Sequence, residues 1–408
     1  MDSKPILFIT DANFLSHLLR CMEIARVLQS KGEKVIFAAS GRYIKLLRQQ
    51  GFEIHPIFTS DPVHTMKATR ASMMKYYDQI RVMRSIDSEI ECLSAIDPKV
   101  VIGDFRWTLK ISAEYCKIPF VSILNTLWTP YYALRRTVPE KLLIRKIIGL
   151  RMCELIGPWL KEKVLVKRGK PFSNARTQLG VSPLKHLNKE MCGDLNLMPD
   201  IPELFPTANL PDNFKYIGPL FAQDDSLLSS DRSIPTTKPY IYVTLGSTAT
   251  DRLIGLIFAT FGKLDVPVVM TTGKQPISHK APDNFLLTDY LHGQDAYKNA
   301  CLTVCHGGHG TLYQALSYGV PIIGIATHND QQWNLDRIQR QQLGRQFNEE
   351  SCTEKMLHDA YTQITSDATY KHNCTKMRKI LAGYDAPSKA ADEIIRFAHN
   401  PTPQYAAI

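Results

Sequence analysis

Residues 301–336 read CLTVCHGGHGTLYQALSYGVPIIGIATHNDQQWNLD and contain two strand patterns joined by a glycine loop and a helix pattern. The apolar, β-branched run over 302–305 predicts a buried strand that breaks at HGGHGT. A helical pattern follows until Gly319, and 320–326 predicts a second buried strand. This order of strand, loop, helix and strand is the unit from which parallel α/β sheets are built.

The glycine loop of this unit is suited to holding an anion. Loop glycines let the backbone approach a ligand closely, and the unpaired amides and positive dipole end of a helix favour phosphate. His306 begins the loop, where it can donate a further hydrogen bond. Asp330 and Gln331 follow the second strand, where a parallel sheet presents its ligand crevice, and both suit sugar hydroxyls. The fragment HGG alone is equally compatible with a simple tight turn.

The composition is that of an ordinary globular protein with excess positive charge. A length of 408 residues predicts two domains, and 44% hydrophobic with 22% charged residues is unremarkable for such a chain. Nine scattered cysteines without a CxxC pair argue against a zinc site and a disulfide framework. With no leader-like amino terminus and no apolar stretch long enough to span a membrane, we expect a cytoplasmic protein.

The net charge of +10 bears on partners more than on fold. No recognisable nucleic-acid-binding module accompanies it, so we expect no nucleic acid partner. An anionic ligand or an anionic membrane surface fits better. Residues 135–170 combine eleven Lys or Arg with apolar positions, a pattern that serves either a helix lying on an anionic membrane or a core-packed helix with a solvated face.

The amino-terminal half begins with alternating strand and helix patterns. PILFIT at 5–10 predicts a buried strand, 16–29 a helix with Ser16 as N-cap, and a second strand and helix follow. This βαβα order predicts a parallel, doubly wound sheet. His17 lies at the start of the first helix, and a later buried strand, KVVIGD, ends at Asp104.

Taken together, HGGHGT, a GVP at the helix end and DQ nine residues after that proline resemble the donor-binding signature of the family 1 glycosyltransferases. Those are nucleotide-sugar-dependent enzymes of GT-B fold, and the likeness is to the bacterial natural-product, macrolide type. Gln314 replaces the family's usual Glu, and Ala326 replaces its second Pro.

The resemblance implies two Rossmann-like domains, each with a doubly wound parallel sheet, facing each other across a cleft. The acceptor-binding domain is expected over 1–221, a polar linker over 222–238 and the donor-binding domain over 239–386. A final helix at about 387–400 is expected to pack back on the first domain.

The resemblance also implies catalytic roles. The family's usual opening, laid over SHLLRCMEIARVLQSKGEKVIF, places His17 on the general base, and a histidine suits this task because its unperturbed pKa lies near 6.5. Asp104 is implied to hold that histidine by a hydrogen bond, although a helix N-cap is an alternative role. The chain departs from the family at Ser16, usually glycine, and at Arg20, usually proline, which brings a cation to the expected site.

A second set of residues is implied to bind the donor. PYIYVTLGST resembles a phosphate-holding loop of the family, and Tyr290 keeps an aromatic that relatives stack on the base, although the following Leu291 departs from their usual sequence. Gln314 lacks the charge with which Glu contacts ribose hydroxyls, which favours dTDP over UDP. The implied donor-binding residues are Gly246, Ser247, Thr248, Tyr290, Leu291, His306, Gly308, His309, Gly310, Thr311, Gln314, Asp330 and Gln331.

The expected function is inverting, metal-independent transfer of a sugar from a dTDP- or UDP-linked donor to a hydroxyl of a small, in some cases lipophilic, acceptor. No metal or cofactor is implied, because the helix terminus meets the diphosphate and the chain has no DxD triad. The alternatives are a membrane-associated lipid glycosyltransferase, another GT-B enzyme such as a phosphorylase or sugar-nucleotide 2-epimerase, and a non-catalytic nucleotide-sugar-binding relative.

Overall fold

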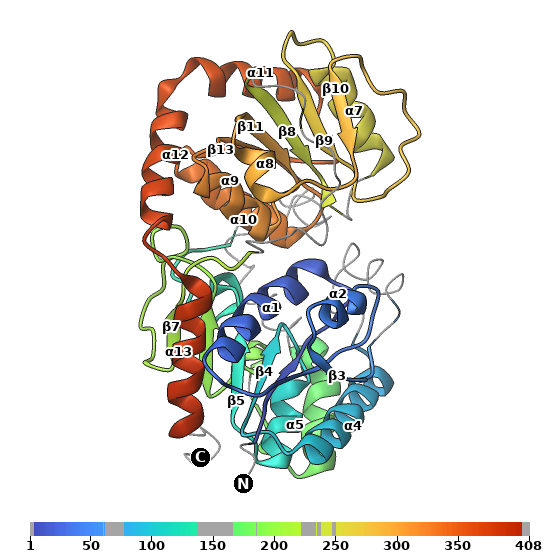
Figure 1. The fold of residues 1–408 in the computed structure, drawn as a ribbon, viewed down its shortest axis with the longest axis vertical. Helices are drawn as coiled ribbons and strands as arrows, with labels where there is room; N and C mark the ends of the chain where they lie inside the picture. The colour runs from blue at the N-terminus through green and yellow to red at the C-terminus, as the bar shows by residue number, and fades with distance from the viewer. Residues whose placement is uncertain are drawn as a thin grey trace. The chain divides into compact units, whose positions relative to one another are not determined.

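The computed structural model describes residues 4–59, 61, 77–136, 166–184, 186–221, 234, 238–246 and 250–401. These residues divide into two compact units (Figure 1). The first unit contains the described residues up to 220 together with 385–401, and the second contains those from 221 to 384. Most of the expected linker, and most of the basic stretch at 135–170, therefore lie outside the described residues.

The first unit is built on a seven-stranded sheet in the order β3-β2-β1-β4-β5-β6-β7, in which every pairing is parallel. Strands β1, β2, β4, β5 and β6 are buried along their whole length, as expected of a parallel sheet covered by helices on both faces. The strands are β1 (Ile6–Ile9), β2 (Val35–Ala38), β3 (Glu53–His55), β4 (Val100–Asp104), β5 (Phe120–Ile123), β6 (Leu195–Met198) and β7 (Phe214–Tyr216).

Helices connect these strands, and the last helix of the chain returns to them. Lys31 at the end of α1 makes an ion pair of 2.8 Å with Asp392 of α13, which packs beside α1 (Figure 1). The helices are α1 (Leu15–Ser30), α2 (Ile44–Gln49), α4 (Gln79–Ile96), α5 (Leu109–Cys116), η2 (Thr126–Trp128), η3 (Leu187–Met191) and α13 (Ala386–His399).

The start of α1 differs from the prediction. Its N-cap is Phe14, whose side chain accepts no hydrogen bond, and Ser16 lies inside the helix, so the assignment of Ser16 as N-cap was wrong. The loop before the helix is instead fixed by Asp11, whose Oδ1 accepts a hydrogen bond of 2.9 Å from the amide of Asn13. This loop sets where His17 emerges from the first turn of α1.

The second unit is built on a six-stranded, wholly parallel sheet in the order β10-β9-β8-β11-β12-β13. Its strands are β8 (Tyr240–Thr244), β9 (Val268–Thr271), β10 (Phe285–Thr288), β11 (Ala300–Cys305), β12 (Ile322–Ala326) and β13 (Gly344–Asn348). Its helices are α7 (Asp251–Phe261), α8 (Gly293–Tyr297), α9 (His309–Ser317), α10 (Asn329–Arg340), α11 (Glu354–Ser366) and α12 (Ala368–Leu381).

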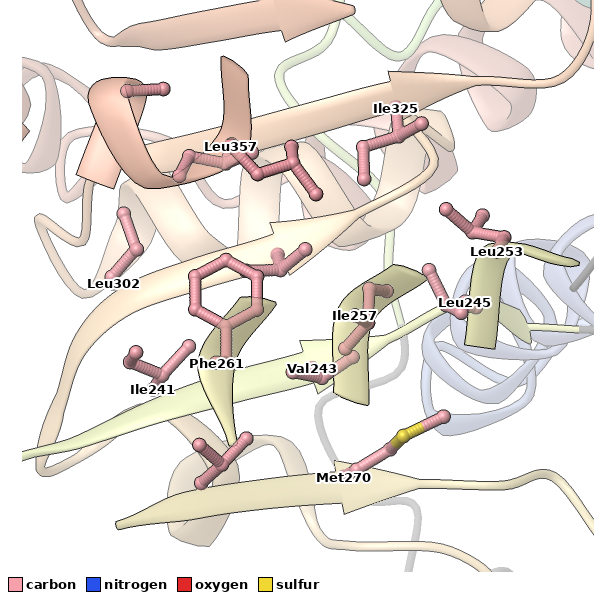
Figure 2. Packing of buried hydrophobic residues seen from close by; sticks show 14 of the residues in the cluster. Ile241, Val243, Leu245, Leu253, Ile257, Phe261, Met270, Leu302, Ile325 and Leu357 are labelled. Carbon is pink, nitrogen blue, oxygen red and sulfur yellow. The ribbon is translucent and has the colours of Figure 1, made fainter. Parts of the chain in front are cut away.

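An apolar core fixes one face of this second sheet. Figure 2 shows Leu253, Ile257 and Phe261 of α7 packed over side chains of the central strands, together with Leu357 of α11. The three α7 residues recur at helical spacing and are almost wholly buried, which explains why this segment forms a helix on the sheet. The side chain of Thr250 caps the same helix by accepting from the amide of Leu253.

Each sheet has a point at which the strand order reverses. In the first, the chain moves outward from β1 to β3 and then resumes at β4 on the other side of β1. In the second, it moves from β8 to β10 and resumes at β11 on the other side of β8. Ligands of open α/β sheets bind at the carboxyl ends of the strands at such points. The β1/β4 edge and the β8/β11 edge are therefore where function is expected.

Candidate functional site

The β1/β4 edge brings together the two residues that the sequence assigned to catalysis. His17 extends from the first turn of α1, directly after β1, and Asp104 is the last residue of β4. Nδ1 of His17 lies 2.9 Å from Oδ1 of Asp104; the histidine side chain is 26% exposed and the carboxylate is completely buried. Asp104 is not a helix cap, because α5 begins at Leu109 with Thr108 as N-cap. The pair therefore has one accessible end, at the imidazole.

Arg20 lies one helical turn after His17 and binds the same carboxylate. Its Nε contacts Oδ2 of Asp104 and its Nη2 contacts Oδ1, while Nη1 donates to Oδ1 of Asn125 at 2.7 Å. Nη2 also lies 3.1 Å from Nδ1 of His17. The arginine is only 5% exposed. The cation that the sequence placed at this site is thus a buried partner of the pair formed by His17 and Asp104.

Asp104 is held in its ionised form by these neighbours. Burial by itself would raise the pKa of this carboxyl, but the charges and hydrogen bonds of Arg20 and His17 together outweigh burial and lower the pKa to about 2. A carboxylate is acceptor-only, so the tautomer with its proton on Nδ1 would donate to Oδ1. That tautomer leaves Nε2 of His17 free to accept a proton.

Two aromatic rings flank His17, and sequence reasoning missed both. The ring of Phe14 lies edge-on with its centroid 5.9 Å from that of the imidazole, and the ring of Phe105 lies at 5.7 Å. Phe105 has a φ of +53°, a left-handed conformation that is costly for a bulky residue and is found most often at functional sites. Its ring continues toward Trp128, whose centroid is 5.4 Å away. Aromatic rings therefore lie beside the imidazole in addition to the charged groups of Asp104 and Arg20.

A second carboxyl, Asp11, follows β1 and interacts electrostatically with the same histidine. Burial raises its pKa, and the amide of Asn13 and the charges of Arg106 and His17 offset only part of that effect. Asp11 is therefore more readily protonated than an exposed aspartate, in contrast to Asp104.

The β8/β11 edge of the second unit is a close arrangement of glycines around His306. A Cβ on Gly246 would lie 2.9 Å from Cε1 of His306, and one on Gly308 would lie 3.0 Å from its Nε2. Gly246 also has a φ of +54°. The imidazole thus fits only because both neighbours lack a side chain. This packing accounts for two of the predicted loop glycines.

His306 itself is neutral and partly unsatisfied. Burial lowers the pKa of its imidazole to about 4, although a hydrogen bond with the backbone of Leu245 acts in the opposite direction. Its Nδ1 is buried and has no hydrogen-bond partner among the described residues. A buried polar nitrogen without a partner is unusual in a native protein and suits a ligand site.

Helix α9 begins at this loop with its amide groups directed toward the same edge. Gly308 is the N-cap, and no side chain among the described residues caps the helix. His309, Gly310 and Thr311 form its first turn, where amides have no acceptor within the helix. Such a terminus favours a phosphate.

Two further residues predicted to bind the donor, Asp330 and Gln331, lie at the start of α10. Gln331 is buried, and its Oε1 accepts from both the amide and the hydroxyl of Thr327, so that oxygen closes the turn before α10. Asp330 lies beside it in the first turn of α10. Asn334, one turn further along, donates from Nδ2 to the carbonyl of Gly307 at 3.1 Å and ties α10 to the glycine loop.

Gln314 and Tyr290 lie toward β10 and α8. A Cβ on Gly293 would lie 3.2 Å from Nε2 of Gln314, so this glutamine reaches the segment that follows Tyr290 and Leu291. Nζ of Lys274 lies 6.0 Å from the centroid of the Tyr290 ring. Ser247 and Thr248 lie outside the described residues. Within those residues, no group of three or more His, Cys, Asp or Glu is placed to hold a metal ion.

Known proteins resemble this chain in sequence. Residues 255–397 match the family described as erythromycin biosynthesis protein CIII-like, C-terminal domain. A PGL/p-HBAD biosynthesis rhamnosyltransferase of Mycobacterium bovis (strain BCG / Pasteur 1173P2) is 30% identical over 384 residues, which cover 92% of this chain and 83% of that protein.

Solved structures resemble the chain in fold. The calicheamicin glycosyltransferase superposes with a TM-score of 0.71 at 16% identity, over 99% of this chain and 100% of that one. The glycosyltransferase VinC, solved in complex with dTDP, superposes with a TM-score of 0.64 at 19% identity, over 97% and 99% of the two chains. Two parallel-sheet units, a matching family profile and a relative along nearly the whole chain identify this protein as a family 1 glycosyltransferase of natural-product type with the GT-B fold.

Proposed function

We propose that this glycosyltransferase moves a sugar from a dTDP-linked donor to a hydroxyl of a small-molecule acceptor, with inversion at the anomeric carbon and without a metal ion. The observation that carries the proposal is the pairing of His17 with a buried, ionised Asp104 at the reversal point of the first sheet. A base with one accessible nitrogen is what deprotonation of an acceptor hydroxyl requires.

The reaction is a single displacement. The acceptor oxygen forms a bond to the anomeric carbon while the bond from that carbon to the donor diphosphate breaks, and attack opposite the leaving group inverts the configuration. Nε2 of His17 takes the hydroxyl proton, and the resulting imidazolium is stabilised by Asp104. The electron pair of the broken bond leaves with the nucleoside diphosphate.

The loop of the second unit would stabilise that departing charge. The amides at the start of α9 are donors already fixed by the fold, so they need no reorganisation as charge develops. His306 would add a donor through its unpartnered Nδ1 when that nitrogen carries the proton. A helix terminus of this kind supplies the positive potential that a divalent cation supplies elsewhere. Turnover is accordingly expected to be unchanged by EDTA.

Within this scheme, Asp330 would hydrogen-bond the sugar hydroxyls. Gln331, whose Oε1 accepts from Thr327, would contact the same hydroxyls. Tyr290 and the backbone of Leu291 would contact the base.

The nucleotide is expected to be dTDP. Gln314 is uncharged where the family's Glu contacts ribose hydroxyls, and the thymidine sugar lacks the 2′-hydroxyl. Two further facts favour dTDP: a structural neighbour was solved with that nucleotide, and a relative is named a rhamnosyltransferase.

Isothermal titration with dTDP and UDP tests this choice. We expect tighter binding of dTDP, and we expect Gln314→Glu to shift the preference toward UDP by about tenfold, equivalent to about one charge-assisted hydrogen bond. Asn334→Ala in the same unit should weaken both nucleotides equally and serves as the control. A wild-type preference for UDP would refute the argument from Gln314.

The acceptor is proposed to be apolar near its reacting hydroxyl. Phe14 and Phe105 flank His17 and favour an apolar or aromatic group there over a hydrated sugar. Screening lipid, phenolic and macrolide-type acceptors with mass detection of the sugar adduct tests this point. The same screen separates a transferase from a sugar-nucleotide epimerase, because an epimerase turns over its donor without an acceptor.

A cytoplasmic location and peripheral contact with an anionic membrane through residues 135–170 are retained as proposals. No helix among the described residues is long and apolar enough to cross a membrane. Most of the basic stretch lies outside those residues. Co-sedimentation with anionic vesicles at low salt tests the membrane contact, and protein that stays in the supernatant would reject it.

A further inference from the structure

We infer that Arg20 is a positioning residue of the reaction, which keeps Asp104 ionised and aimed at His17 without touching either substrate. The inference rests on the proposed function of His17 as the base. It goes beyond that function because the family's usual residue at this position is proline, so the family pattern does not predict such a cation.

Hydrogen bonds of Arg20 connect three segments of the first unit. Residues 17 and 20 share one face of α1, and the carboxylate of Asp104 reaches that face from the end of β4. The guanidinium binds both carboxylate oxygens, and its third nitrogen, Nη1, donates to Asn125, which follows β5. A two-pronged arginine contact fixes the plane of a carboxylate as well as its position.

The protonation state of Asp104 determines which ring nitrogen of His17 carries the proton. Nη2 of Arg20 and Nδ1 of His17 lie 3.1 Å apart and both approach Oδ1 of Asp104. If Asp104 is ionised, Nδ1 donates to it and Nε2 carries the lone pair that a base needs. If Asp104 were protonated, Nδ1 would become the acceptor, and the proton would move to Nε2. The charge on Asp104 therefore selects the reactive tautomer.

Arg20 maintains that charge against burial. Besides Arg20 and His17, Asp104 faces the Sγ of Cys21 at 3.8 Å, and burial raises the pKa of this thiol well above its usual value, so it stays uncharged. Around these groups, Asp200 acts on Arg20, and Asp11 interacts electrostatically with His17. Among the described residues, Arg20 is the permanent cation bonded to Asp104. Without it, burial would raise the pKa of Asp104, and the carboxyl would protonate as the pH falls through that higher value.

Stability alone is a weak reason for such a pair. Replacing a buried ion pair by packed apolar residues is often neutral or stabilising. The opening usual in the family has a proline at this position, so an arginine is not a general requirement of this helical turn. A role in the reaction accounts for both the burial and the two-pronged contact.

The test compares Arg20→Gln and Arg20→Lys with wild type in steady-state kinetics from about pH 5 to pH 9, a range that brackets imidazole titration. Arg176→Gln is the control, because Arg176 is also a buried, ion-paired arginine of the first unit but binds Glu190 and Glu114 away from the site. For Arg20→Gln we expect kcat to fall on the order of 100-fold near pH 6 and to recover as the pH rises, with KM for the donor unchanged. Arg20→Lys should restore the wild-type pH profile.

A purely structural role predicts something else. It would lower the active fraction of Arg20→Gln by one factor at every pH, as expected for Arg176→Gln, and that result would overturn the inference. If Arg20→Gln fails to fold, the decision passes to Arg20→Lys. Loss of its activity selectively on the acid side would show that the retained charge does not protect Asp104.

A second measurement separates this inference from the proposed function. The ring nitrogens of His17, observed by NMR in ¹⁵N-histidine-labelled protein and assigned with His17→Gln, report the tautomer directly. We expect the Nδ1–H form in wild type and the Nε2–H form in Arg20→Gln at neutral pH. An unchanged tautomer would refute the role of Arg20 even if sugar transfer occurs. A changed tautomer without any transfer would uphold Arg20 and count against the proposed function.

Discussion

At the scale of single residues, the chemistry depends on how two histidines differ. His17 is partly exposed and hydrogen-bonded to a buried carboxylate, whereas His306 is enclosed between glycines with its pKa lowered to about 4. The first arrangement suits proton acceptance, and the second leaves a buried ring nitrogen without a described partner beside the glycine loop. Identical side chains thus have distinct acid–base and hydrogen-bonding properties in their different surroundings.

Substitution of the catalytic pair gives the first residue-scale prediction. His17→Ala should lower kcat about 1000-fold, and Asp104→Asn should cause a comparable loss, because proton removal by a positioned base contributes on the order of 100- to 10,000-fold. KM for the donor should remain unchanged, since the loop proposed to bind the donor belongs to the other unit. Steady-state kinetics with a saturating acceptor measures both values. Full activity of His17→Ala would remove the histidine from the mechanism.

The glycines around His306 give the second residue-scale prediction. Gly246→Ala should weaken dTDP binding at least tenfold, because the new methyl group would displace the imidazole. Gly273→Ala is a matched control: that residue also has a positive φ, +61°, but no described atom lies within 4 Å of the added Cβ. Both variants should lose about 1 kcal/mol of stability from backbone strain. Equal dTDP affinity in the two variants would mean that the position of His306 does not matter for the nucleotide.

Local sequence patterns predicted features along the chain, whereas the contact between His17 and Asp104 across it was implied only by the family resemblance. The strand that ends at Asp104, the loop at His306 and the glycines beside it follow from local patterns of apolar residues and turn formers. Arg20 and Asp104 are 84 positions apart, and their contact depends on how α1 packs beside β4. Likewise, the hydrogen bond from the amide of Thr327 to the side-chain oxygen Oε1 of Gln331 depends on the conformation of the turn before α10.

At the scale of elements, each candidate site lies where a strand ends and the following helix begins. In the second unit, α10 is bound to the glycine loop through Asn334, whose amide donates to the carbonyl of Gly307. Gly307 has a φ of +87°, and a Cβ there would collide with Leu335 of the same helix. The loop that precedes α9 is therefore shaped by α10 as well as by its own glycines.

Removing the hydrogen bond between Asn334 and Gly307 should weaken binding at the proposed anion site. Asn334→Ala should cost about 1 to 3 kcal/mol of stability, because the buried carbonyl of Gly307 loses its partner. It should also weaken dTDP, while KM for the acceptor stays the same. Thermal unfolding and nucleotide titration measure the two effects. Weakened acceptor binding with intact dTDP affinity would contradict this view of α10.

At the scale of the whole molecule, two parallel-sheet units each place a candidate site where their strand order reverses. The pattern of alternating strands and helices was sufficient to predict this architecture, because parallel sheets require crossover helices. The resemblance added the assignment of acceptor and donor to the two units. Acceptor identity could not be predicted, since it depends on side chains gathered from segments without a periodic pattern, such as Phe14 and Phe105.

The most direct test measures both products of the reaction, the released dTDP and the glycosylated acceptor. Wild-type protein is incubated with a dTDP-linked sugar of known anomeric configuration and an acceptor identified by screening, and the product is analysed by NMR. We predict one equivalent of dTDP per glycoside, a product of inverted configuration, and no measurable product from His17→Ala on the same timescale. A product with retained configuration, or an undiminished rate in His17→Ala, would contradict the account.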